Sequence, residues 1–188
     1  HRVNYGLTYR VNFHLAERRE LFNTSDYSLY NKPERTYTAN RPDNVEASAV
    51  SFASHSIARI HASLDWRPGL TYSIRNGRKN PNYDRSPEVT LMYQKAIPGI
   101  FGNGLAADFD QVEASVKHAV KFAASGKLDF NVTGGTFLNA NQVFFQDFKH
   151  FGGNRTLFSN MGAAANFRVM DYYRYSTSGA YVSAIAHY

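Results

Sequence analysis

Hydrophobic and polar residues alternate strictly over residues 3–15, which read VNYGLTYRVNFHL. Alternation with a period of two is the pattern of a β-strand, whose successive side chains point to opposite faces. The run exceeds the roughly 5–6 residues of an average strand and reaches the roughly 9–11 residues that a tilted strand needs to cross a bilayer. One parity is aliphatic and aromatic, and the other carries Arg10, Asn12 and His14. Taken alone, the run fits a strand of a transmembrane β-barrel or an edge strand of a soluble β-sandwich.

The same alternation returns further along the chain. It predicts strands over residues 57–67, 88–94, 112–122, 128–133 and 180–188. Residues 16–44 are polar and rich in turn formers, so we predict a long extracellular loop there, whereas the connections at Pro68 and Ser125 are short. We predict one all-β domain over residues 1–188. It is an antiparallel transmembrane β-barrel, present as a fragment of about six or seven strands of a larger barrel.

Strand parity then assigns residues to the two faces of this sheet. The predicted lipid-facing residues are Tyr5, Tyr9, Phe13, Ile60, Leu64, Val116 and Val120. The predicted lumen-facing charges are Arg10, His61, Asp65, Glu113 and Lys117.

Composition agrees with this interpretation and argues against one class of partner. Aromatic residues make up 15% of the chain, which suits strands and interfacial girdles. The net charge of +6 is scattered along the chain, so we predict no nucleic-acid partner. The first residue is His1 and the last, Tyr188, ends an alternating run, from which we expect an interior piece of a longer protein.

No pattern in the sequence predicts catalysis. The seven histidines include no H-E-x-x-H motif, so we predict no metal site, no cofactor and no enzymatic activity. Carboxylates such as Asp65 and Glu113 lie beside basic residues on the polar parity, where charge pairing across a lumen is favoured over a catalytic carboxylate pair.

The alternating pattern stops between residues 137 and 175, where aromatic residues and glycines dominate. Exposed to water, those rings would form a large apolar patch, so we predict that residues 148–175 fold inward and line or plug the lumen. The alternative is a loop outside the barrel that binds a partner. The predicted lumen-loop residues are Phe148, Phe151, Gly152, Gly153, Asn154 and Arg155. From the residues alone, Arg155 either meets an acidic partner as a bidentate donor or follows a simple glycine turn into solvent.

Four runs carry a resemblance to a known family. They are LMYQKAIPGIFGNG, FDQVEASVKHAVKF, QVFFQDFKHFGGNRTLF and DYYRYSTSGAYV. In order and spacing they resemble Bacteroidota outer-membrane proteins with an N-terminal carboxypeptidase-regulatory-like domain and an uncharacterised C-terminal barrel. That barrel is distantly similar to the BamA-like surface-antigen superfamily, in which a loop reached through an aromatic, double-glycine segment folds back into the lumen. Phe145, Phe148, Phe151, Gly152 and Gly153 match this approach.

The tip of that loop does not match, because Arg155 follows Gly153 closely and no glycine comes after it. The resemblance implies a bacterial outer-membrane location, extracellular loops at residues 16–44 and 97–107, and periplasmic turns at Pro68 and Ser125. It also implies a role in assembling or translocating polypeptides, with outer-membrane lipid and other outer-membrane or periplasmic proteins as partners. The alternatives are a passive pore or structural barrel that anchors attached domains, and a soluble β-sandwich adhesin.

Overall fold

The protein is all-β in the computed structural model, which describes residues 2–4, 6–20, 52–83, 86–102, 104–122, 126–154, 167–168, 170 and 173–188. The strands are β1 Arg2–Asn4, β2 Leu7–Arg18, β3 His55–Trp66, β4 Tyr72–Arg75, β5 Arg78–Pro81, β6 Glu88–Ala96, β7 Asp108–Phe122, β8 Gly126–Gln142, β9 Gly153–Asn154, β10 Phe167–Arg168 and β11 Tyr181–His187. A short 3₁₀ helix, η2, spans Phe145–Asp147. Within the described ranges, no helix is both long and apolar enough to cross a membrane.

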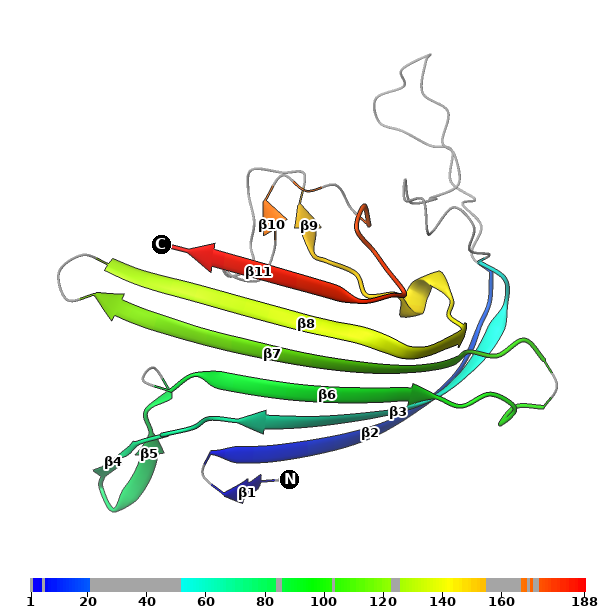
Figure 1. Cartoon of the computed structure of the whole chain (residues 1–188). Helices are drawn as coiled ribbons and strands as arrows, with labels where there is room; N and C mark the ends of the chain where they lie inside the picture. Colours follow the sequence, from blue (N-terminus) through cyan, green and yellow to red (C-terminus); the bar gives the residue numbers. More distant parts are fainter. Residues whose placement is uncertain are drawn as a thin grey trace, which may run out of the picture.

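Seven strands form one antiparallel sheet in the order β1-β2-β3-β6-β7-β8-β11. Strands that neighbour each other in this sheet follow each other along the chain, apart from two inserted pairs. β4 and β5, between β3 and β6, pair with each other, and β9 and β10, between β8 and β11, pair in parallel. The sheet is twisted and curved, and β9, β10 and η2 lie over one of its faces (Figure 1). β1 and β11 are its two edges.

The register collects apolar side chains on one face, here called the apolar face. One row crosses six strands through Tyr9, Leu64, Leu91, Ala114, Gly134 and Val182. Large side chains of this face are exposed, for example Phe13 at 58% and Val182 at 78%. The predicted lipid-facing residues that the structure describes all lie on it, while Tyr5 lies outside the described residues.

The opposite face, here called the polar face, contains the buried core. An adjacent row runs through Arg10, Ser63, Met92, Glu113, Gly135 and Tyr181. Towards the loop end of the same face, Ile57, Ala96, Phe109 and Phe144 are fully buried or nearly so. The protein thus buries apolar residues beneath its own loop segment and leaves the apolar face of the sheet uncovered in the described part of the chain.

The predicted single strand over residues 3–15 is wrong. β1 pairs antiparallel with β2, so the chain reverses between Asn4 and Leu7. Gly6 permits this turn to lie against the end of β3: its carbonyl accepts a 2.8 Å hydrogen bond from the Arg67 amide, and a Cβ there would lie 2.8 Å from the Arg67 carbonyl oxygen. Hydrophobic and polar residues keep alternating through the turn, so the alternation alone does not reveal that the chain reverses there.

Two other predicted boundaries differ from the structure. β2 continues through residues 16–18, which pair with the start of β3, and residues 21–44 of the predicted loop lie outside the described residues. β8 runs to Gln142, far beyond the predicted end at Thr133, because its glycines and asparagines pair with the long strand β7. The irregular aromatic segment therefore begins after β8.

Gly135 tests the packing that joins β8 to its neighbours. A Cβ there would lie 2.4 Å from the Tyr181 hydroxyl oxygen and 2.6 Å from the Val112 carbonyl oxygen, whereas a Cβ at Gly134 would come no closer than 3.6 Å to Val182. We expect Gly135→Ala to lower the free energy of unfolding by about 1–3 kcal/mol through overpacking, and Gly134→Ala to change it by less than about 1 kcal/mol. Urea unfolding of both variants in detergent micelles measures the difference, and equal stabilities would contradict the geometry.

Candidate functional site

Residues 144–151, which follow β8, lie on the polar face and are here called the polar-face segment. Its Phe144 ring stacks on the His55 ring with centroids 3.5 Å apart and planes within 2° of parallel. Its Asp147 reaches Arg18 of β2, and its Lys149 reaches Glu113 of β7. The segment therefore spans the polar face from one side of the sheet towards the other.

Asp147 is the charged centre of the first attachment, and its side chain is fully buried. Arg18 Nη1 donates a 2.7 Å hydrogen bond to Asp147 Oδ2, and Arg59 Nη1 lies 3.8 Å from Oδ1. His55 Nδ1 lies 2.9 Å from the Ala53 carbonyl oxygen. Because a carbonyl oxygen can only accept a hydrogen bond, Nδ1 carries the proton and donates it. Nε2 is then free to accept a hydrogen bond from Arg18 Nη1 at 3.4 Å. One carboxylate thus compensates two guanidinium groups.

This attachment is under-satisfied. Among the described residues, Asp147 Oδ1 and Arg59 Nε are buried without a hydrogen-bond partner. Buried ionic groups are costly unless their partners satisfy them. The arrangement therefore holds the polar-face segment in position through charge attraction more than through a complete hydrogen-bond network.

Glu113 is the centre of the second attachment, which joins three strands to the polar-face segment. Its Oε2 accepts a 2.6 Å hydrogen bond from the Tyr181 hydroxyl and an ion-paired hydrogen bond from Lys149. The Tyr181 hydroxyl in turn accepts from Gln111 Nε2 at 2.8 Å, and Gln111 accepts from Gln94. Lys149 Nζ also lies 5.2 Å from the centroid of the Tyr181 ring, a cation–π distance.

Aromatic rings pack the remainder of the segment. Phe145 lies 5.7 Å from Phe148, 4.9 Å from the His150 ring and 5.4 Å from Tyr173, measured between centroids. His150 Nδ1 forms a 2.8 Å hydrogen bond with Ser176 Oγ. Burial lowers the pKa of His150 from its ordinary value, against the opposing effects of the Phe145 carbonyl and of Asp147. The packed segment thus favours the neutral imidazole.

The five predicted lumen-facing charges share the polar face, but the structure joins only one of them to the polar-face segment. Glu113 is paired with Lys149, as described above. Asp65 accepts a 2.8 Å hydrogen bond from Thr90 on the neighbouring strand. His61 is opposite Asn12 and Gln94, and Arg10 and Lys117 are exposed.

The predicted lumen-loop residues fall partly inside the described chain. Phe148 is buried at 7% exposure, and Phe151 packs edge-on against Tyr181 at 5.8 Å. The Gly152 carbonyl accepts a hydrogen bond from the Phe167 amide, and Gly153 begins β9. The backbone of Asn154 completes β9, while Arg155 lies outside the described residues.

Sequence reasoning missed the residues that anchor this segment. Asp147 and Lys149 are the acidic and the basic residue of the aromatic run FFQDFKHF. A single charged residue among aromatic residues indicates a buried side chain with a partner of opposite charge. Their partners are far away in sequence: Arg18 is separated from Asp147 by 129 positions. In the part of the chain that the structure describes, no three His, Asp or Glu side chains are grouped to hold a metal ion.

Fold and site together define an all-β protein with a two-faced antiparallel sheet whose polar face carries its own loop segment. Residues 1–188 match the model of the C-terminal domain of a family of unknown function, DUF5686, and the chain belongs to this family. Comparison with curated proteins and with solved structures gives no match.

Replacing the buried carboxylate tests the first attachment. Asp147→Asn removes the charge that faces Arg18 and Arg59 and keeps the side-chain shape. The two arginine side chains are 23% and 28% exposed, so water compensates part of the loss, and we expect a decrease of about 1–3 kcal/mol in the free energy of unfolding. Faster protease cleavage within the polar-face segment should accompany it.

Asp129→Asn is the matched control. Asp129 pairs with Lys127 at 2.8 Å, but its side chain is 30% exposed and that of Lys127 is 50% exposed, so its loss should cost less than about 1 kcal/mol. If both variants lose the same stability and the same protease resistance, Asp147 does not anchor the segment.

Proposed function

We propose that this chain forms part of the wall of a transmembrane β-barrel in a bacterial outer membrane. The observation that carries the proposal is the exposed apolar face, which continues across six neighbouring strands of the sheet, from β2 to β11. In water such a face would be a very large apolar patch, whereas acyl chains cover it without cost. β2, β3, β7 and β8 have 12, 12, 15 and 17 residues, more than the roughly 9–11 that a tilted spanning strand requires.

The placement of the polar-face segment argues against a soluble sandwich. A sandwich packs the apolar faces of two sheets together. Here the covering segment lies on the polar face and forms ion pairs with it through Asp147 and Lys149. A polar interior with a loop inside it is the arrangement expected of a barrel lumen.

A barrel in lipid must be closed, because unpaired backbone groups there cost several kcal/mol each. In this sheet β11 forms one edge, and three-residue β1 covers only the start of β2 at the other. We therefore propose that further strands, most simply from the same polypeptide, pair with these two edges.

For the role of the barrel we propose assistance in the assembly or translocation of polypeptides at the outer membrane, without enzymatic chemistry. This rests on the resemblance of the segment from Phe145 to Gly153 to the inward loop of BamA-like proteins, in a Bacteroidota family with an N-terminal carboxypeptidase-regulatory-like domain. Other outer-membrane or periplasmic proteins would be its partners.

A structural barrel that anchors attached domains is the second candidate, and one observation favours it. The polar-face segment is fixed by two ion-paired attachments, at Asp147 and at Glu113. A segment fixed in the lumen in this way leaves less room for a passing polypeptide and suits a stable anchor.

Single cysteines test the barrel, since the chain has none of its own. Leu91 and Val132 on the apolar face and Asn12 and Lys117 on the polar face are all exposed in the isolated chain. In intact outer membranes we expect a water-soluble maleimide to label the polar-face variants Asn12→Cys and Lys117→Cys. The apolar-face variants Leu91→Cys and Val132→Cys should be labelled about tenfold more slowly, because thiolates do not form in lipid. Equal labelling of both faces would refute the barrel wall.

Site-specific photo-crosslinking separates the two roles. A crosslinking residue at Arg10, on the polar face, should capture unfolded outer-membrane polypeptides during their synthesis if the barrel handles them. The same residue placed at Val132, on the apolar face, is the control and should capture lipid. Crosslinks at Arg10 that form only within the protein's own barrel would decide for the structural anchor.

A further inference from the structure

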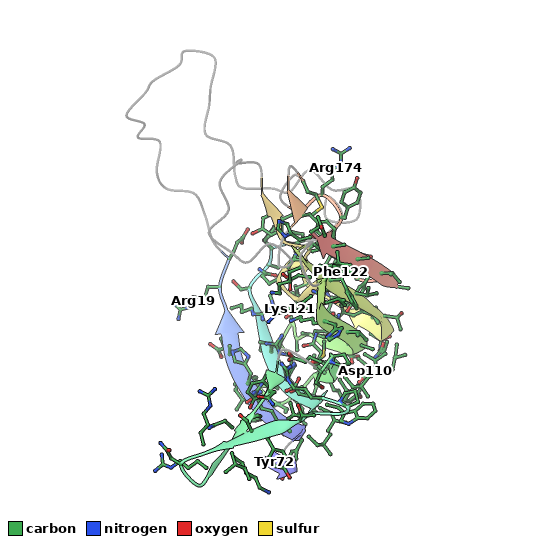
Figure 2. All side chains as sticks on the ribbon, turned by 90° about the vertical axis from the view of Figure 1, so that its left-hand side faces the viewer. Arg19, Tyr72, Asp110, Lys121, Phe122 and Arg174 are labelled. Atoms are coloured by element: carbon green, nitrogen blue, oxygen red, sulfur yellow. The ribbon has the colours of Figure 1, made fainter. Side chains whose placement is uncertain are left out.

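The β4–β5 hairpin is a separate structural unit at the turn end of the sheet. Its two strands are joined by Asn76 and Gly77, whose φ angles of 50° and 73° are both left-handed. This is the conformation of a tight two-residue hairpin turn, for which Asn-Gly is the favoured sequence. The hairpin, which carries Tyr72, projects away from the main sheet (Figure 2).

Positive charge is concentrated at the end of this hairpin. Arg75 is paired directly opposite Arg78, and Lys79 follows. Like charges opposite each other destabilise a strand pair. Residues 70–83 contain no acidic residue, and neither arginine forms an ion pair within the described chain. An anion from outside the protein would relieve the repulsion between Arg75 and Arg78, so this end of the hairpin is suited to bind one.

The other side of the hairpin is amphipathic. Tyr72 and Ile74 are 47% and 67% exposed, and Lys79 Nζ lies 4.6 Å from the centroid of the Tyr72 ring. Tyrosine and lysine in this arrangement offer apolar surface with a polar end, which is typical of groups at a membrane–water interface.

The position of the hairpin identifies the level of the membrane that it would meet. β3 ends at Trp66, which is exposed at 50% in the last row of the apolar face, opposite Leu7 and Val89. Tryptophan is enriched where acyl chains meet headgroups. The hairpin begins six positions later, after the Pro68-Gly69 turn.

We propose that the β4–β5 hairpin binds the phosphate groups of anionic phospholipids at the surface of the leaflet next to Trp66. The inference rests on the proposed barrel wall, which sets the height of Trp66. Arg75 and Arg78 supply planar, bidentate phosphate donors, while Tyr72 and Ile74 contact the glycerol and upper acyl region. The hairpin thereby fixes the depth of the barrel in its membrane.

A fluorescent label at Asn80→Cys reports this binding in the full chain, held in neutral detergent micelles and titrated with phosphatidylglycerol. We expect a saturable spectral shift, and a 10- to 30-fold higher phosphatidylglycerol requirement, roughly, in the Arg75→Gln/Arg78→Gln variant. Arg19→Gln/Arg174→Gln is the control, since it makes the same change in net charge at other sites and should leave the titration unchanged. Lys79 and its contact with Tyr72 stay intact in both variants.

Three further measurements separate the outcomes. Glycerol phosphate and a polyglutamate peptide should not reproduce the shift; if either does at similar phosphate or carboxylate concentration, the hairpin binds a soluble anion or an acidic protein and the proposal falls. In the complete barrel, reconstituted with the strands that close it, a label at Leu91→Cys should be quenched by nitroxide-bearing acyl chains in phosphatidylcholine vesicles. Quenching there without any phosphatidylglycerol response at Asn80 overturns the hairpin proposal alone, whereas absence of quenching overturns the barrel wall and the hairpin proposal together.

Discussion

The register of the seven-stranded sheet is the constraint on which the rest of the structure depends. Because side chains alternate along a strand, a slip of one residue would move every apolar side chain of that strand to the opposite face. Antiparallel pairing keeps Tyr9, Leu64 and Leu91 in one row and Arg10 and Glu113 in the next. The same register therefore sets the apolar face and places the charges that receive the polar-face segment.

The charges on the polar face give that segment a defined position. Apolar contacts alone would let aromatic rings such as Phe145 and Phe148 settle in several ways, since hydrophobic packing is not directional. Among the described residues, the buried Asp147 carboxylate faces Arg18 and Arg59, and Lys149 pairs with Glu113. Ion pairs of this kind add little net stability, but displacing one partner is costly.

Alternation in the sequence predicted most of the main sheet. The strand predicted over residues 57–67 is β3, His55–Trp66, and the one predicted over 88–94 is β6, Glu88–Ala96. Local pattern failed where a tertiary contact is involved: the chain turns at Gly6, where the absence of a side chain lets the Arg67 backbone lie close. Asn76-Gly77 is a favoured sequence for a two-residue hairpin turn, and both residues have positive φ angles in the structure.

The candidate site was less accessible to sequence reasoning. Parity assigned Arg10, His61, Asp65, Glu113 and Lys117 to one face, because parity is a local property. Which of these charges would be paired depends on contacts such as Glu113 with Lys149, 36 positions away, and no periodicity encodes them. The predicted lumen loop centres on the glycines before Arg155, whereas the described anchors are Asp147 and Lys149, which precede those glycines.

Tyr181 connects the polar-face segment to the edge of the sheet. It is the first residue of edge strand β11, its hydroxyl donates to Glu113, and its ring contacts both Phe151 and Lys149. Gly135 makes room for that ring on β8. Because Tyr181 belongs at once to the edge and to the second attachment, a partner strand that moves β11 must also shift the hydrogen bond to Glu113. The position of the polar-face segment and the state of this edge are therefore coupled through one side chain.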